Sequence, residues 1–218
     1  MNLRIRPFTA PPFGENTYVA WQDGAAEGVC VDPGNVITDV LAFLDAEKLA
    51  VVAILLTHAH LDHVDGVAEL VRSTGAPVYL HPDDRPLYDH VSRQAAQFGL
   101  RVEEPPTPDH TLAHGQAIEF AGVEYQVRHV PGHSPGHVLF HVEEARCAFV
   151  GDVVFQGSIG RTDLPGGDYA QLIASIRAHV LTLPDDTHLL PGHGPATTVA
   201  HERTTNPFLI PHYGGGLA

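Results

Sequence analysis

The segment from residue 51 to residue 63 constrains this chain more than any other stretch. An uninterrupted apolar run, Val51–Leu56, is followed without a gap by the motif THAHLDH at residues 57–63. A short apolar run of this kind indicates a buried strand. Residues two apart point to opposite sides of a strand, so His58 and His60 converge only where the chain turns as it leaves the sheet. We therefore predict a buried strand that ends in a loop of metal-ligand side chains.

The side chains of this motif are of the kind that bind divalent metal ions. Neutral imidazole and carboxylate are ligands that zinc, iron and manganese accept, and the motif contains no thiolate. The alternative is a solvated polar loop that is rich in histidine by chance, in a chain with 16 His among 218 residues. The preceding strand and the spacing of the histidines favour the metal site.

The composition argues against several classes of function. Lys and Arg number 12 against 26 Asp and Glu, and the formal charge of -14 opposes binding to nucleic acid or anionic lipid. The start of the chain has no apolar core of signal-peptide length and no apolar run is long enough to span a membrane, so we expect a soluble, cytoplasmic protein. Cys30 and Cys147 lie in apolar, strand-like stretches and are predicted to be buried free thiols, which fits a reducing cytosol.

The hydrophobic pattern predicts alternating groups of strands and helices. Besides 51–56, strands are expected at residues 3–8, 17–21, 28–31, 77–80, 117–120, 123–130, 138–142, 147–150 and 187–190. Helices are expected at 36–48 with Asn35 as N-cap, from Asp65-Gly66 to Gly75, and at 84–98, 169–180 and 199–204; a frayed tail is expected at 214–216. Each half of the chain has strands first and helices later. We therefore predict the α/β class, with two mixed β-sheets packed face to face and helices outside, a four-layer αββα sandwich.

Three later segments share one design, an apolar strand that ends in glycine followed by His or Asp. They are VPGH at 130–133, FVGD at 149–152 and LPGH at 190–193. Glycine lets the backbone pass close to an ion, and the rigid strand holds the direction of the ligand. Taken singly, Asp152 is equally well explained as a turn cap and His193 as a surface residue. Together with the first motif, these segments predict one composite site.

The same residues resemble the signature of the metallo-β-lactamase superfamily over nearly the whole chain. The GRTD segment at 160–163 and the segments PGHGP at 191–195 and NPFL at 206–209 resemble the single-domain bacterial type II glyoxalase-like (hydroxyacylglutathione hydrolase-like) enzymes. The resemblance implies two divalent metal ions, zinc first, with iron or manganese as alternatives. It implies that one ion is held by His58, His60 and His133, the other by Asp62, His63 and His193, and that Asp152 bridges them.

Such a site predicts a hydrolase. A divalent ion lowers the pKa of bound water from about 15.7 to about 7, so a metal-bound hydroxide is expected to attack a carbonyl carbon. A thiolate leaves with little proton assistance because the pKa of a thiol is about 8.5, which favours a thioester of the S-lactoylglutathione type. Asp62 is the candidate to orient the hydroxide or accept its proton. The alternative from another reaction class is a mononuclear iron persulfide dioxygenase, which shares a similar first His cluster and a similar GRTD segment.

Several residues have weaker signals. Arg161 is a candidate for holding a substrate carboxylate, although an ion pair with Asp163 is the favoured interpretation. His137 is expected beside the site without being a ligand, and the loop 155–168 is expected to line the substrate cleft. The other His residues, His212 among them, are expected to be ordinary surface or core residues. Only 25 residues follow His193, so we expect one domain over 1–218 without a separate C-terminal helical domain that binds glutathione. The expected partner is a small acyl thiol. The sequence does not indicate an oligomeric state.

Overall fold

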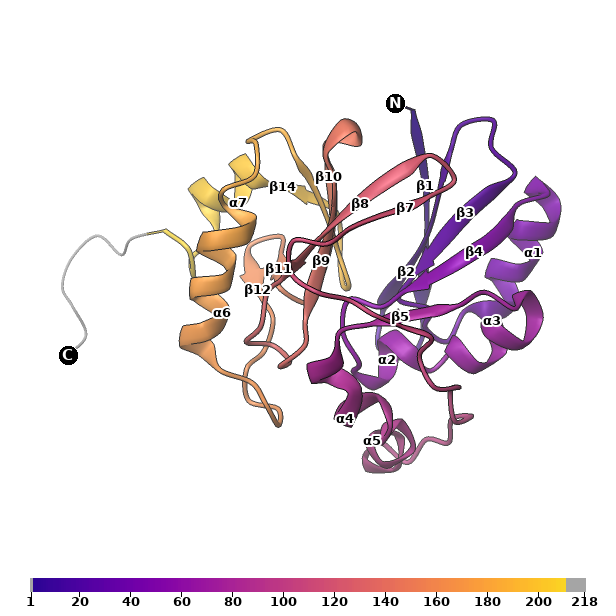
Figure 1. The fold of residues 1–218 in the computed structure, drawn as a ribbon. Coiled ribbons are helices and arrows are strands. Elements are labelled where there is room, and N and C mark those ends of the chain that lie inside the picture. The colour runs from indigo at the N-terminus through magenta and orange to yellow at the C-terminus, as the bar shows by residue number, and fades with distance from the viewer. Residues whose placement is uncertain (1, 211–218) are drawn as a thin grey trace.

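In a computed structural model, which describes residues 2–210, two β-sheets pack against each other and helices cover both outer faces (Figure 1). The first six-stranded sheet has the order β1-β2-β3-β4-β5-β6, and the second has the order β14-β13-β10-β9-β8-β7. Both sheets are mixed, because parallel pairs β3–β4, β4–β5 and β10–β13 stand beside antiparallel pairs such as β1–β2 and β8–β9. The predicted four-layer αββα arrangement is confirmed.

The first half of the chain builds the first sheet and its helices. Its elements are β1 (Leu3–Ala10), β2 (Glu15–Gln22), β3 (Glu27–Val31), α1 (Ile37–Glu47), β4 (Ala50–Leu55), α2 (Leu61–Val64), α3 (Val67–Thr74), β5 (Val78–Leu80), a 3-10 turn at Pro82–Asp84, α4 (Arg85–Tyr88), α5 (Val91–Gln97) and β6 (His110–Thr111).

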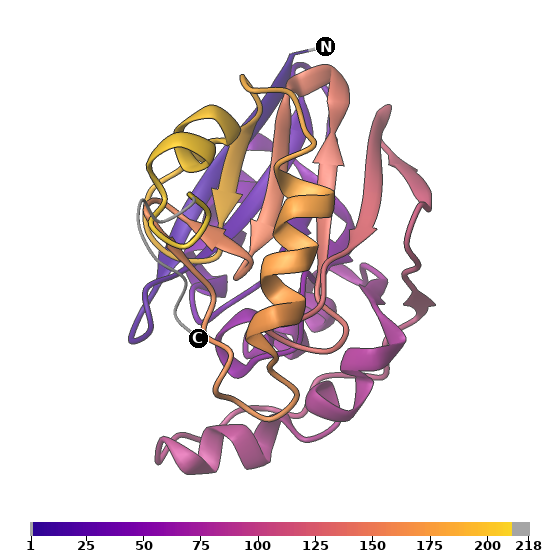
Figure 2. The same ribbon diagram turned by 90° about the vertical axis from the view of Figure 1, so that its left-hand side faces the viewer.

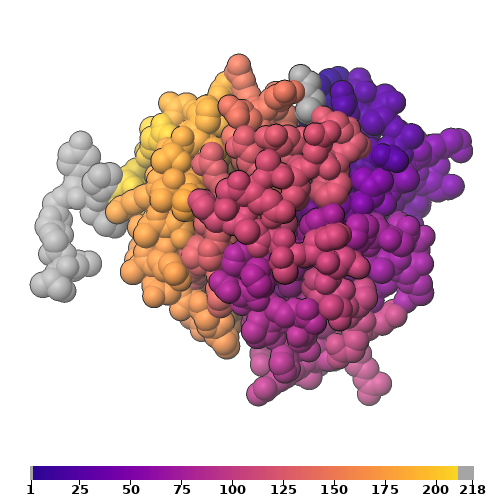
Figure 3. Space-filling model, viewed as in Figure 1, coloured from indigo at the N-terminus to yellow at the C-terminus, as the bar shows by residue number. Residues whose placement is uncertain are grey.

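The second half repeats the order of strands followed by helices. Its elements are β7 (Ala117–Phe120), β8 (Val123–His129), β9 (Val138–Val142), a 3-10 turn at Glu143–Ala145, β10 (Cys147–Gly151), the hairpin β11 (Val154–Phe155) and β12 (Ser158–Ile159), α6 (Tyr169–Ser175), a π-helical turn at Ile176–Val180, β13 (His188–Pro191), β14 (Thr197–Thr198) and α7 (Val199–Thr205). The two halves lie side by side in the space-filling view (Figure 3).

The main core lies between the two sheets. Val31 and Leu55 of the first sheet share one buried cluster with Phe140 of the second, and Tyr18 meets Phe149 edge to face with ring centroids 5.5 Å apart. The helix that begins with α6 lies on the outer face of the second sheet (Figure 2). Its apolar residues, Leu172 and Ile176 among them, share a buried cluster with residues of the strands. The sequence of β4 is an unbroken apolar run, because a central strand that is covered on both faces needs apolar side chains on both.

The helix N-cap that the sequence predicted at Asn35 is wrong, and the start predicted at Asp65-Gly66 needs correction. Helix α1 begins at Ile37 with no side-chain cap, because the Asn35 side chain donates instead to the carbonyl oxygen of Pro11 at 3.3 Å. Helix α3 begins after Gly66, and Asp65 ends the short helix α2 that the sequence had suggested to be loop. The predicted end of α3 is confirmed, since Gly75 adopts the left-handed conformation at its C-cap.

Two predicted helices are interrupted. The segment predicted as one helix over 84–98 is a 3-10 turn followed by the short helices α4 and α5, which are separated at Asp89 and His90. The helix predicted over 169–180 changes to π-helical turns at Ile176. Cys30 and Cys147 are free and buried, as predicted. The tail at 214–216 and His212 lie outside the described residues. No helix within residues 2–210 is long and apolar enough to cross a membrane.

Candidate metal centre

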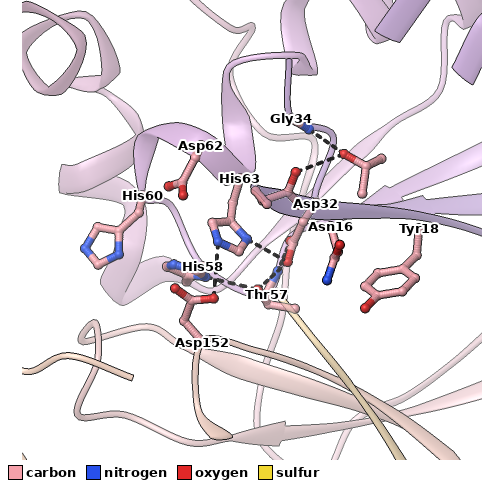
Figure 4. Close-up of polar contacts among 12 residues, drawn as sticks. Asn16, Tyr18, Asp32, Gly34, Thr57, His58, His60, Asp62, His63 and Asp152 are labelled. Atoms are coloured by element: carbon pink, nitrogen blue, oxygen red, sulfur yellow. Dashed lines mark hydrogen bonds and ion pairs between the residues drawn. The ribbon is translucent and has the colours of Figure 1, made fainter. Parts of the chain in front are cut away.

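All the predicted ligand segments follow the ends of strands at one edge of the sandwich. The loop after β4 carries His58 and His60, and the segments after β8, β10 and β13 carry His133, Asp152 and His193. Strands β10 and β13 are parallel neighbours, so their C-terminal ends meet at the same edge. Helix α2, which was not expected, carries Asp62 and His63 in one turn and turns both side chains toward this edge (Figure 4).

The seven predicted ligand residues come together as two triads around a central carboxylate. Potential ligand atoms of one triad lie within 4.8 Å of one another, and so do those of the other; the triads are His58, His60, His133 and Asp62, His63, His193. Asp152 contacts both groups. Its Oδ1 lies 3.4 Å from Nε2 of His63, and its Oδ2 lies 3.5 Å from Nε2 of His133 and 3.6 Å from Nε2 of His193.

The hydrogen bonds behind the imidazoles select which ring nitrogen faces the centre. His63 donates its Nδ1 proton to Asp32 at 3.0 Å, and His133 donates its Nδ1 proton to the carbonyl oxygen of Arg161 at 2.8 Å. The Thr57 hydroxyl donates to Asp32, so its oxygen accepts from Nδ1 of His58 at 3.1 Å. Each of the three rings therefore points Nε2 toward the centre, and Nε2 is the atom that would bind a metal.

Buried polar atoms at the centre support the fit to cations. Among the described residues, Nε2 of His58, Nε2 of His63 and Oδ1 of Asp152 are buried without a hydrogen-bond partner. A buried polar atom without a partner costs about 1–3 kcal/mol. These atoms belong to both triads and to the carboxylate between them. Divalent cations would satisfy all of them, so the residues present fit a pair of metal ions.

The charge state of the side chains agrees with this fit. Burial lowers the pKa of His60 to about 3 and holds the pKa of His58 well below its ordinary value, so both imidazoles stay neutral. Burial alone would raise the pKa of Asp152, but the adjacent His63 holds it well below its usual range. In turn, burial lowers the pKa of His63, but the carboxylates of Asp152 and Asp62 raise it above normal. The centre is therefore a place where positive charge is stabilised.

Asp32 supports the site from behind and was not singled out by the sequence. It is buried and has a left-handed backbone (φ 48°), and it accepts hydrogen bonds from the Thr57 backbone N–H at 2.7 Å and the Thr57 hydroxyl at 2.6 Å, besides the bond from His63. Figure 4 shows this carboxylate next to His63 and Thr57. Its sequence context, DPGN after a strand, suggested only a turn.

Asp84 is a second supporting carboxylate that the sequence did not reveal. It is fully buried and accepts from the Ala59 backbone N–H at 2.9 Å and from the Ser134 hydroxyl at 2.7 Å. It also accepts from the Gly136 backbone N–H at 2.5 Å. Asp84 thus ties the first ligand loop to the loop that carries His133. It stands in the ordinary-looking stretch HPDD, which carries no signal for this role.

His137 lies beside the site, as predicted. Its ring stacks on that of His58 with centroids 4.6 Å apart, and its Nε2 accepts a hydrogen bond from the backbone N–H of Asp152 at 3.0 Å. Burial holds the pKa of His137 well below its ordinary value, so the ring is neutral and able to accept this bond. His137 therefore helps to place the central carboxylate.

The glycine before His193 is required by close packing. A Cβ atom on Gly192 would lie 2.2 Å from Oδ1 of Asp152 and 2.5 Å from Cε1 of His63. Real Cβ atoms essentially never approach so closely. A side chain at this position would therefore push Asp152 out of its place between the triads.

A cavity of about 480 Å³ opens over the centre. Its lining includes Asp62 and Asp152 and, as predicted, several residues of the loop 155–168. Arg161 also lines it, but its guanidinium holds both oxygens of Asp163 at 2.7 Å, which confirms the expected ion pair.

Comparison with known proteins places these features in a family context. Residues 10–193 match the family model of the metallo-beta-lactamase superfamily. The hydroxyacylglutathione hydrolase GloC of Haemophilus influenzae is 38% identical over 211 residues, which cover 96% of this chain and 98% of that protein. The crystal structure of TTHA1623 in a di-iron-bound form is 46% identical with a TM-score of 0.86, and covers 94% of this chain and 100% of that one. The BLEG-1 B3 metallo-beta-lactamase is 37% identical with a TM-score of 0.90, and covers 95% and 100%.

Proposed function

This chain belongs to the metallo-β-lactamase superfamily, and from that premise we propose that it is a binuclear metal-dependent hydrolase of S-acyl thiols, of the S-lactoylglutathione type. The observation that carries the proposal is the pair of ligand triads with Asp152 between them. The similarity to a hydroxyacylglutathione hydrolase over nearly the whole length of both chains supports it.

Seven residues would hold the metal ions. His58, His60 and His133 would bind one ion, Asp62, His63 and His193 the other, and Asp152 both. When bound, divalent ions supply a low pKa for coordinated water and polarisation of a carbonyl group. Nitrogen and oxygen ligands suit zinc, iron and manganese. We expect zinc first, and the di-iron form of a similar protein supports iron as an alternative.

Asp62 is positioned to orient the attacking water and accept its proton. It lies on α2, lines the cavity, and has Oδ2 3.2 Å from Nε2 of His193. Burial would raise its pKa, but His63 brings it below its ordinary value, so the group is a carboxylate that can accept a hydrogen bond. In this proposal Asp62 fixes the direction of attack on the thioester carbonyl.

The cavity lining suits a leaving group that needs no acid. Among the lining residues that the structure describes, there is no Lys, Tyr or Cys to protonate the departing atom. A thiolate leaves without such help because its conjugate acid has a pKa of about 8.5. We propose that residues 1–218 act as one domain on a small acyl thiol in the cytoplasm, and the buried free thiols of Cys30 and Cys147 support the reducing compartment.

A persulfide dioxygenase with one iron is the second candidate, favoured by the similar first His cluster and the similar GRTD segment at 160–163. One iron ion needs only one set of ligands, whereas this chain brings a second set, Asp62, His63 and His193, to the same edge. The complete second triad therefore supports the hydrolase.

The test is metal analysis combined with a thiol-release assay on protein purified from its own host. We expect about two metal equivalents per chain, release of free thiol from S-lactoylglutathione, no oxygen uptake with a persulfide, and loss of turnover after chelation. One iron per chain with oxygen consumption would establish the dioxygenase instead. No turnover of any acyl thiol would overturn the hydrolase.

A further inference from the structure

We propose that the group of the substrate that fills the cavity is an uncharged, apolar acyl chain rather than a charged peptide. This inference rests on the proposed thioesterase function and specifies its substrate class. It follows from three features of the cavity: its mostly apolar lining, an exposed aromatic side chain at its rim, and the ion pair that Arg161 makes with Asp163.

Apart from the candidate ligand residues, most of the residues that line the cavity are apolar, and they come from both halves of the chain. The first half contributes Phe13, Leu61, Leu87 and Phe98, and the second half contributes Phe155, Ile159, Leu164 and Pro165. The segment that contains α5 and the loop before α6 project from the same end of the sandwich (Figures 1 and 2). A volume of about 480 Å³ is that of a small-molecule site.

The rim of the cavity contains an aromatic pair that is not fully covered. Phe13, from the turn between β1 and β2, meets Phe98, which follows α5, edge to face with centroids 5.2 Å apart. Phe98 keeps 59% of its surface exposed. Burying apolar surface is worth about 25 cal/mol per Å², so a chain that leaves the centre and covers Phe98 gains binding energy. A charged group in this place gains none.

Outside the candidate ligand residues, the polar groups that line the cavity are the neutral Gln94, Gln97 and Ser158 and the ion-paired Arg161, so the described lining offers a carboxylate no unpaired Lys or Arg. Among the described residues, Arg161 is the one Lys or Arg in the lining, and both carboxylate oxygens of Asp163 occupy it. The Gln94 side chain is also occupied, because its amide group donates to the carbonyl oxygens of Ala59 and Leu87. Glutathione would bring two carboxylates to a chain with a formal charge of -14. An uncharged acyl chain needs no cation to bind it and is not repelled by the negative charge of the protein.

The experiment measures kcat/KM of the metal-loaded enzyme on thioesters of N-acetylcysteamine with acetyl, butyryl, hexanoyl and octanoyl groups, with S-lactoylglutathione as reference. We expect kcat/KM to rise roughly fourfold for each added methylene until the chain fills the cavity, because each buried CH₂ contributes about 0.8 kcal/mol. The hexanoyl ester should exceed the reference. Turnover of S-lactoylglutathione with a flat or falling acyl series would overturn the inference and leave the proposed function standing. No hydrolysis of any thioester would overturn both.

A pair of variants on one segment separates binding from folding. Phe98→Ala is expected to lower kcat/KM about tenfold on the hexanoyl ester and much less on the acetyl ester, since about 1.4 kcal/mol of contact corresponds to a factor of ten. Leu100→Ala is the matched control, because Leu100 is exposed, lies two residues further on, and is outside the lining. It should leave both rates unchanged. Equal losses on the two esters, or the same pattern in Leu100→Ala, would contradict an apolar acyl site.

Discussion

Asp32 shows how a single residue outside the ligand set controls the candidate centre. Its one carboxylate receives hydrogen bonds from Nδ1 of His63 and from the backbone and hydroxyl of Thr57. Thr57 in turn fixes the ring of His58. One buried carboxylate therefore sets the tautomer of an imidazole in each triad. Replacing a hydrogen-bond partner of a metal-binding histidine typically costs about 10- to 100-fold in metal affinity or activity.

Replacing Asp32 by Asn tests this role with almost no change of shape. Asp32 accepts the backbone N–H of Thr57 at Oδ1, and it accepts both the N–H of His63 and the hydroxyl of Thr57 at Oδ2. An amide has one acceptor oxygen and one donor group, so its NH₂ opposes the donors at one of these two positions. We expect Asp32→Asn to lower metal affinity or turnover about 10- to 100-fold. Metal content after dialysis against a weak chelator and kcat with saturating metal are the measurements. Unchanged metal retention in a folded variant would show that Asp32 only shapes the turn.

At the scale of elements, Asp84 joins two ligand loops that belong to different sheets. It stands at the junction of the 3-10 turn and α4, and it accepts hydrogen bonds from Ala59 after β4 and from Ser134 and Gly136 after β8. Burial raises the pKa of this carboxyl, and the three donors oppose that effect. The loops that carry His60 and His133 are thereby held to each other without any ion.

Removing this side chain should loosen both loops together. Asp84→Ala leaves buried N–H and O–H donors without an acceptor, each at about 1–3 kcal/mol, so we expect a loss of about 3 kcal/mol in the free energy of unfolding. Urea titration of the metal-free protein measures it. Asp83→Ala, on the same turn but exposed, is the matched control and should stay within about 0.5 kcal/mol of the parent. A loss of similar size in both variants would refute the bridging role.

At the scale of the whole molecule, buried neutral histidines outside the ligand set should make folding sensitive to acid. Burial, with the neighbouring His129 for His81 and Arg128 for His141, lowers the pKa of both groups. As the pH falls, these histidines are protonated first in the unfolded chain, near pH 6.5. Their contribution to the free energy of unfolding is therefore present above that pH and is lost as the pH falls toward the lower pKa of the folded state.

The prediction is that the free energy of unfolding of the metal-free protein decreases from about pH 7.5 to about pH 5.5. Urea titrations at the two pH values measure the difference. His141→Gln removes one titrating group, and glutamine keeps a donor for Gln126, the present partner of Nδ1. The difference between the two pH values should become smaller in this variant. An equal or larger difference would contradict the assignment.

The longer strands, the layer order and the seven candidate ligand residues that lie at one edge could all be predicted from the amino-acid sequence. These features depend on local signals: apolar runs that must be buried, and His or Asp placed directly after a strand, where the chain has to turn. The residues around 58–63, 133, 152 and 193 carry such signals without reference to any partner.

The hydrogen-bond partners of the candidate ligands and the cavity beside them become visible in the three-dimensional structure alone. The hydrogen bond between Asp32 and His63 joins residues 31 positions apart, and the one between Asp84 and Ser134 joins residues 50 positions apart. Local sequence patterns do not indicate such distant partners. The predicted N-cap at Asn35 is wrong for the same reason. The Asn35 side chain donates to the carbonyl oxygen of Pro11, which is distant in sequence, and not to the end of the helix. The apolar cavity likewise exists only where Phe13 and Phe98 meet. These contacts join residues that are far apart in the sequence, so they depend on how the whole chain folds.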